Sequence, residues 1–250
     1  SSDLKKEENY GDRLACIGEL HIWFTDGTST KILTDSSWLA QTSPVTASGI
    51  YSGEVYDPAA EGVKQYGVEE ISLAKEKLMP RLNPPITVER KISPQALLYT
   101  PAGEWVLDMG QNMVGWLEFV CREPAGTKIF LQFGEILQDG NFYRDNLRTA
   151  EASFTYLSDG KERLIRQHFT FYGFRYVKLT GFSGKPDPES FRGLVIHSAM
   201  EDISRISTSN ALVNKLYENV KWGQRGNFLD LPTDCPQRDE RYGWTGDAQV

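Results

Sequence analysis

About the first 200 residues consist of strand-length apolar segments separated by turns that contain glycine or proline. Asp26-Gly27 is a typical hairpin dipeptide, and Pro101-Ala102-Gly103 and Asp159-Gly160 punctuate the chain further on. Strand-length segments recur roughly every 10 to 15 residues from residue 86 onward, with no helix-patterned run between them. This pattern predicts a mainly β protein built from antiparallel β-sandwiches.

Changes of pattern along the chain predict three regions. Residues 1–85 form a partial amino-terminal β-sandwich plus a linker, because 59–85 is charged and ends in prolines. Within this linker we expect a short helix over Glu69 to Leu78. Residues 86–200 form a second β-sandwich, and residues 201–250 begin a helical domain.

The helical region is indicated by a different periodicity. Ser207 to Asn210 supply N-cap residues, and Leu212, Leu216 and Val220 follow at a spacing of four. The spacing predicts an amphipathic helix of about 15 residues. Because one helix cannot bury its own apolar face, we expect more helical chain after residue 250 and interpret this region as the start of a longer domain.

Composition narrows the possible partners. The formal net charge of -7 argues against nucleic acid or an anionic membrane surface. No run approaches the roughly 20 apolar residues of a membrane span. Aromatic residues make up 12% of the chain, which suits ligands with flat apolar faces such as sugars. The oligomeric state is not predictable, and the compartment stays open between the cytoplasm and an exported location, since no signal peptide precedes the first strands.

Isolated cysteines and histidines predict neither a disulfide nor a metal site or cofactor. The three cysteines and three histidines lack Cys-x-x-Cys or His-x-x-x-His spacing. Cys235 has no histidine near it in sequence, so a structural thiol is favoured over a nucleophile. Phe169, Phe171, Tyr172, Phe174 and Tyr176 predict an aromatic strand in the sandwich core, with a sugar platform as the alternative.

The candidate functional segment lies at residues 230–249. Pro232 and Pro236 exclude regular helix between them, so neighbouring side chains can converge on one space. Carboxylates and arginines suit sugar hydroxyl groups, and an indole suits the apolar face of a pyranose. A salt-bridged surface loop would show the same composition, so both interpretations stay open at this point. The residues concerned are Asp230, Asp234, Asp239, Glu240 and Asp247, with Arg238, Arg241 and Trp244.

The contiguous segment 227–249 resembles the signature of bacterial α-L-rhamnosidases, glycoside hydrolase family 78. The resemblance extends upstream and covers most of residues 13 to 250. Upstream it rests on Trp38 and on the segments 51–57, 107–116, 134–137, 139–141 and 171–176.

The resemblance implies β-sandwiches ahead of an (α/α)6 barrel and the inverting hydrolysis of terminal α-L-rhamnose. Glu240 matches the general acid of the family. The family's general base is a second Glu far downstream, beyond residue 250, so the chain alone is expected to be inactive. Two rivals remain, a non-catalytic carbohydrate-binding β-sandwich protein and a structural spacer. The matches to the rhamnose pocket are Asp234, Arg238, Trp244 and Asp247.

Overall fold

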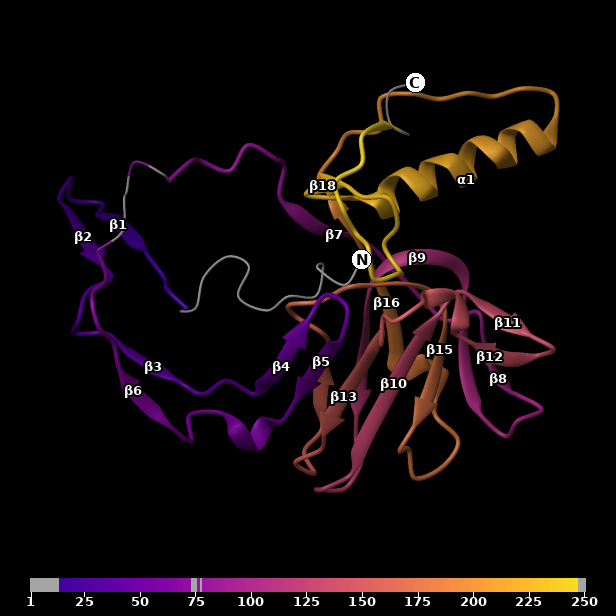
Figure 1. The fold of residues 1–250 in the computed structure, drawn as a ribbon, viewed down its shortest axis with the longest axis horizontal. Coiled ribbons are helices and arrows are strands. Elements are labelled where there is room, and N and C mark those ends of the chain that lie inside the picture. The colour runs from indigo at the N-terminus through magenta and orange to yellow at the C-terminus, as the bar shows by residue number, and fades with distance from the viewer. Residues whose placement is uncertain (1–13, 73–75, 77, 247–250) are drawn as a thin grey trace. The chain divides into compact units, whose positions relative to one another are not determined.

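The computed structural model describes residues 14–72, 76 and 78–246 (Figure 1). Contacts divide the chain into two compact units, which are treated separately. The first comprises Ser1–Ser43 and Ala60–Pro80, and the second comprises Pro44–Ala59 and Arg81–Val250.

The first unit contains two separate two-stranded antiparallel sheets. One pairs β1 (Glu19–Trp23) with β2 (Ser29–Leu33), and the other pairs β3 (Leu39–Gln41) with β6 (Gln65–Gly67). The hairpin predicted at Asp26-Gly27 is confirmed, because the Asp26 carboxylate accepts hydrogen bonds from the amide and hydroxyl of Thr28. No described residue of this unit is buried, so its described part forms no sandwich of its own.

The linker is described only in part where a helix was expected. Glu69 to Ser72 and Leu78 are not helical, Glu76 has 3-10 helical conformation, and residues 73–75 and 77 lie outside the described residues. A 3-10 turn, η2 (Pro58–Ala60), precedes this stretch, where the chain passes from the second unit to the first.

The second unit is built on one ten-stranded sheet, confirming its mainly β character. Its strand order is β4-β5-β13-β10-β15-β9-β16-β7, with β8 and β14 also paired to β9. The ten strands are β4 (Val45–Gly49), β5 (Gly53–Tyr56), β7 (Ile86–Ile92), β8 (Ala96–Tyr99), β9 (Trp105–Cys121), β10 (Lys128–Gly134), β13 (Ser153–Leu157), β14 (Arg163–Ile165), β15 (Tyr172–Thr180) and β16 (Phe191–Ser198). A separate hairpin pairs β11 (Ile136–Gln138) with β12 (Asn141–Tyr143), and the 3-10 turns η4 (Asp145–Leu147) and η5 (Pro188–Ser190) lie in the connections.

Two features of this sheet differ from the prediction. The pairing of β5 with β13 is parallel, whereas the other pairings are antiparallel. The β4–β5 hairpin also comes from residues 45–56, within the region expected to form the first unit. Gly53 permits this docking, because a Cβ there would lie 1.8 Å from the Ser153 carbonyl oxygen and its φ is +86°. The boundaries 1–85, 86–200 and 201–250 stay predictions.

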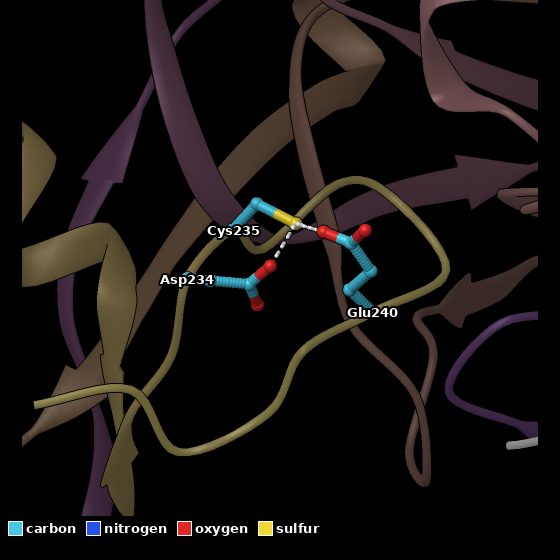
Figure 2. Close-up of side chains that lie close together, drawn as sticks. All are labelled: Asp234, Cys235 and Glu240. Carbon is cyan, nitrogen blue, oxygen red and sulfur yellow. Dashed lines mark hydrogen bonds between the residues drawn. The ribbon is translucent and has the colours of Figure 1, made fainter. Parts of the chain in front are cut away.

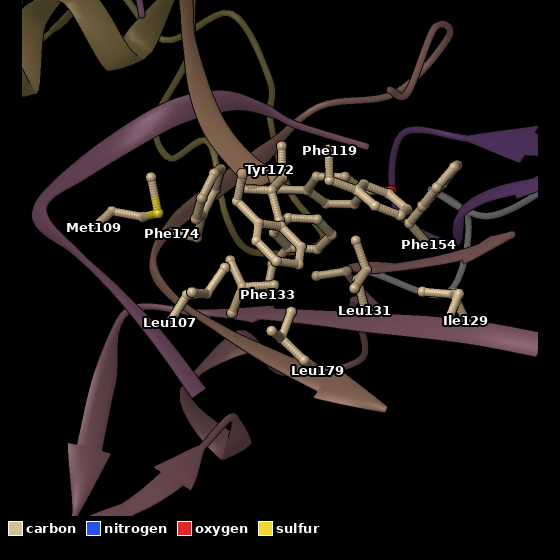
Figure 3. Close-up of a cluster of buried hydrophobic side chains, with 14 of the residues drawn as sticks. Leu107, Met109, Phe119, Ile129, Leu131, Phe133, Phe154, Tyr172, Phe174 and Leu179 are labelled. Atoms are coloured by element: carbon tan, nitrogen blue, oxygen red, sulfur yellow. The ribbon is translucent and has the colours of Figure 1, made fainter. Parts of the chain in front are cut away.

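Strand β9 makes the sheet curl. Its first residues pair with β8 and β15, and its last residues pair with β14 and β16. The bend visible in Figure 1 folds the sheet around a core of aromatic and aliphatic side chains (Figure 3). Phe133 and Tyr172 stack at the centre of this core, with ring centroids 3.9 Å apart.

The aromatic strand prediction is right in its second half only. Tyr172 and Phe174 are buried, but Phe169 is 71% exposed. The reason is that β15 begins at Tyr172, so Phe169 lies before the strand and outside its alternation.

The predicted helix is confirmed as α1 (Ala211–Asn227). The Asn210 side chain caps it by accepting hydrogen bonds from the amides of Leu212 (2.9 Å) and Val213 (3.4 Å). Its expected apolar face is uncovered here, with Leu212 80% exposed and Leu216 62% exposed. In the described part of the chain α1 is the one α-helix, so the (α/α)6 barrel stays a prediction, and no described helix has the length and hydropathy of a membrane span.

Candidate functional site

The loop after α1 is a closed, non-helical structure, as its prolines predicted. β17 (Phe228–Leu229) and β18 (Leu231–Pro232) form a minimal hairpin around Asp230. Backbone hydrogen bonds then close the loop from both sides, from the Trp244 amide to the Pro232 carbonyl and from the Asp234 amide to the Tyr242 carbonyl. The segment between these contacts therefore points its polar side chains into a small common space.

Two carboxylates and a thiol converge in that space (Figure 2). One oxygen of Asp234, one oxygen of Glu240 and the Cys235 sulfur all lie within 4.8 Å of one another. The thiol, on a residue only 4% exposed, donates to Asp234 Oδ2 at 3.5 Å and to Glu240 Oε2 at 3.9 Å. Cys235 is thus a buried bridge between the carboxylates.

Arg238 supplies the positive charge of this cluster. Its Nη2 lies 3.2 Å from Glu240 Oε2 and 3.8 Å from Asp234 Oδ2, and its Nε donates to the Cys235 sulfur at 3.3 Å. The guanidinium group therefore contacts all three members of the cluster. A cation already stands where a metal ion would bind, so these three residues are better explained as a polar site than as a metal centre.

The electrostatics of Asp234 distinguish it within the cluster. Burial acts to raise the pKa of Asp234, but hydrogen bonding with the Glu240 carboxyl group and with Cys235 outweighs burial, so the net pKa is lowered. Its second oxygen, Oδ1, is buried and has no hydrogen-bond partner within the described chain. Asp234 is thus an ionised acceptor with an unused oxygen.

Glu240 is surrounded by polar groups. Its side chain is 26% exposed and forms an ion pair with Arg148, which follows η4 in the β unit. Trp244 is itself 60% exposed, and its amide rather than its indole ties it into the loop. The structure therefore brings Asp234, Arg238 and Glu240 together, and leaves Trp244 at the surface. Asp247 lies outside the described residues.

A polar cavity of about 490 Å³ opens beside this cluster. One wall is formed by Asp234, Cys235 and Arg238, and another by α1 around Trp222. The third wall comes from the β sheet, at Asn112 on β9 and Glu135 after β10. Its volume lies within the ~300–1,000 Å³ usual for small-molecule sites.

Comparison with protein families matches three successive segments. Residues 2–90 match the α-L-rhamnosidase N-terminal domain, and residues 98–197 match the bacterial α-L-rhamnosidase concanavalin-like domain. Residues 201–250 match the bacterial α-L-rhamnosidase 6 hairpin glycosidase domain. Together these three segments cover nearly the whole chain. The chain belongs to the bacterial α-L-rhamnosidase family.

Individual α-L-rhamnosidases agree with this assignment. The chain is 38% identical to an α-L-rhamnosidase of Streptomyces avermitilis, over 96% of this chain and 25% of that protein. It superposes on the α-L-rhamnosidase of Aspergillus terreus with a TM-score of 0.90 at 37% identity, covering 95% of this chain and 29% of that one. The Streptomyces avermitilis enzyme in complex with L-rhamnose gives a TM-score of 0.89 at 37% identity, covering 95% and 24%.

The chain therefore spans about a quarter of the length of these rhamnosidases. The segment that carries Asp234, Arg238 and Glu240 falls in the part matched to the glycosidase domain. Arg148 and Asn112, by contrast, lie in the part matched to the concanavalin-like domain.

The residues that the β sheet contributes to the site carry no signal in the sequence that links them to residues 234–240. Glu135 accepts hydrogen bonds from Asn112 (2.9 Å) and Asn146 (3.2 Å). Arg148 gave no signal, because it lies 92 positions from Glu240 and no local pattern encodes that pairing. Only the fold shows that Glu135 lines the cavity and that Arg148 pairs with Glu240.

Proposed function

We infer that this chain is part of an α-L-rhamnosidase that removes terminal α-L-rhamnose from oligosaccharides or glycosides. The observation that carries the inference is the cluster of Asp234, Cys235, Arg238 and Glu240 beside a polar cavity, within the segment matched to a glycosidase domain. The structural relative from Streptomyces avermitilis is described in complex with L-rhamnose, which supports the same sugar here.

Glu240 takes the role of general acid. Glycoside cleavage needs a carboxylic acid that protonates the leaving oxygen as the bond to the sugar breaks. The lowered pKa of Asp234 suits a residue that stays ionised and accepts hydrogen bonds rather than a proton donor. The unused Oδ1 of Asp234 and the guanidinium of Arg238 then serve sugar hydroxyl groups, with Trp244 and Asp247 expected at the same pocket.

The general base lies outside this chain in our proposal. An inverting pair of carboxyl groups stands about 6.5–9.5 Å apart to admit a water molecule. Asp234 and Glu240 approach within 4.8 Å, which leaves no room for that water. The relatives are about four times as long as this chain, so the general base can belong to the part of the protein that this chain does not include. We therefore expect the 250-residue chain alone to release no p-nitrophenol from p-nitrophenyl α-L-rhamnoside.

Replacing Glu240 tests the assignment in the whole protein. Glu240→Gln keeps the shape of the side chain but carries no acidic proton, so kcat should fall about 10²- to 10⁴-fold for an alkyl rhamnoside. Binding of rhamnose, measured by calorimetry, should change little. Unchanged turnover would remove Glu240 from the mechanism, and rhamnose binding with no turnover even in the unaltered protein would favour a carbohydrate-binding protein.

The first sugar released reports the stereochemistry. Inversion yields the β anomer, which NMR detects before the sugar equilibrates. Release of the α anomer would contradict the inverting mechanism, and would instead point to the close carboxylate Asp234 as a nucleophile.

A further inference from the structure

The segment that bears Glu240 is fastened to the β sheet at several points. The residues that contact it come from the tip of the β4–β5 hairpin, from the chain after η4 and from the residue just before β15. All of them belong to the second unit.

Arg241, the residue after Glu240, is the centre of this attachment. It is 8% exposed, and its guanidinium lies 4.6 Å from the centre of the Phe171 ring and 5.5 Å from that of Tyr51. Nη1 donates to the carbonyls of Ile50 and Phe171, and Nε donates to the Arg238 carbonyl at 3.1 Å. The rigid, planar guanidinium group of Arg241 therefore contacts two aromatic rings and three carbonyl acceptors, which fixes the backbone next to Glu240.

Tyr51 makes the most direct contact. Its hydroxyl donates to the backbone carbonyl of Glu240 at 2.6 Å. Tyr51 is fixed in turn, because its own carbonyl accepts from the amides of Glu151 (2.9 Å) and Ala152 (3.3 Å). Burial raises the pKa of Tyr51, so its hydroxyl keeps the proton that it donates.

The hairpin tip that carries Tyr51 is anchored independently. Glu54, only 2% exposed, accepts hydrogen bonds from the amides of His168 and Phe169. The Thr170 hydroxyl donates to the Gly49 carbonyl at 3.0 Å. The hairpin and the chain leading into β15 thus form one rigid support beneath the loop.

We propose that Tyr51 and Arg241 are positioning residues, through which the β sheet sets the position of the Glu240 carboxyl group. The inference rests on the proposed function, since it gives Glu240 the role of acid. The β sheet is then part of the catalytic apparatus, because a misplaced acid transfers its proton poorly.

Tyr51→Phe in the whole protein tests the proposal, because it removes one hydroxyl and leaves the ring on Arg241. Proton donation matters for an alkyl leaving group and little for a nitrophenolate, which leaves without a proton. We expect kcat for an alkyl rhamnoside to fall about 10-fold and kcat for the nitrophenyl rhamnoside less than about 2-fold, with KM for both nearly unchanged.

Tyr172→Phe is the matched control. It also removes a tyrosine hydroxyl that donates to a backbone carbonyl, that of Ser153 at 2.8 Å, but this contact lies within the sheet. Its effect on kcat should be the same for both leaving groups. Arg241→Lys is a second test variant, which keeps the charge but loses the fork, and it should show the leaving-group dependence of Tyr51→Phe or a larger one.

The outcomes separate the two claims. An equal loss for both leaving groups in Tyr51→Phe, or no loss at all, overturns the positioning role even if Glu240→Gln abolishes turnover of the alkyl rhamnoside. If Glu240→Gln retains turnover, the proposed function itself fails. Only a leaving-group-dependent loss in Tyr51→Phe, absent from Tyr172→Phe, supports the proposal.

Discussion

Arg241 shows how one residue can differ from its apparent role in the sequence. In the sequence it is one of several alternating charges that suit a solvated loop. In the structure it is buried against two aromatic rings, and burial lowers its pKa to about 10, so it remains a cation at neutral pH. The alternation of charge was visible in the sequence, but burial depends on the long-range contact with Tyr51 and Phe171.

Gly173 on β15 is a second residue whose importance is steric. A Cβ at this position would lie 2.9 Å from Gln237 Cβ and 3.3 Å from the Gln237 amide nitrogen, so the loop must move to admit one. For Gly173→Ala we expect a loss of stability of about 1–3 kcal/mol in chemical denaturation. Turnover of the whole protein should fall about 10-fold or more.

Gly184→Ala provides the comparison for this variant. No atom lies within 4 Å of a Cβ at Gly184, so stability and turnover should both stay close to those of the unaltered protein. Full turnover in a folded Gly173→Ala protein would show that the loop tolerates displacement.

At the scale of elements, an ion pair between Asp108 on β9 and Arg175 on β15 joins the bend of β9 to its neighbour strand. Arg175 donates to both oxygens of Asp108, at 2.8 and 2.9 Å, and the Gly110 amide donates to the same carboxylate. The Arg175 side chain beside it is chiefly what lowers the pKa of Asp108. The pair therefore stabilises the point at which β9 begins to turn.

The lowered pKa gives this pair a pH dependence of known sign. A carboxylate whose folded pKa lies below its unfolded value stabilises the fold above the unfolded pKa of about 3.9, and loses this contribution as the pH falls through the folded pKa. Asp108→Asn should cost about 1 kcal/mol at pH 7, because Arg175 is 37% exposed and solvent screens the pair.

Urea unfolding at pH 7 and at pH 3 checks this expectation. The difference between Asp108→Asn and the unaltered protein should shrink at the lower pH. A difference as large at pH 3 as at pH 7 would mean that the charge on Asp108 does not supply the stability.

Elements that depend on local chemistry were predictable, and pairings between distant segments were not. The Asn210 cap of α1 and the Asp26-Gly27 hairpin follow from neighbouring residues, so the sequence predicted both. The pairing of the β4–β5 hairpin with β13 was not predictable, because β13 lies about a hundred positions away. Alternation along a strand identifies its buried face but not its neighbour.

At the scale of the whole molecule, the site depends on segments that are far apart in the sequence. The resemblance predicted Asp234, Arg238 and Glu240, and the structure brings these three together beside a cavity. Tyr51 and Arg148, which contact Glu240 from the β sheet unit, lie 189 and 92 positions from it in the sequence. The resemblance therefore predicted which residues lie together, and only the fold showed which distant residues contact them.

A crystal structure of the whole protein soaked with a rhamnoside tests the central claim most directly. We predict that the oxygen joining rhamnose to its leaving group lies about 2.6–3.2 Å from a Glu240 carboxyl oxygen, with Asp234 and Arg238 on the sugar hydroxyl groups. Rhamnose bound tens of ångströms from Glu240 would contradict the assignment of this loop as the acid-bearing part of a rhamnosidase.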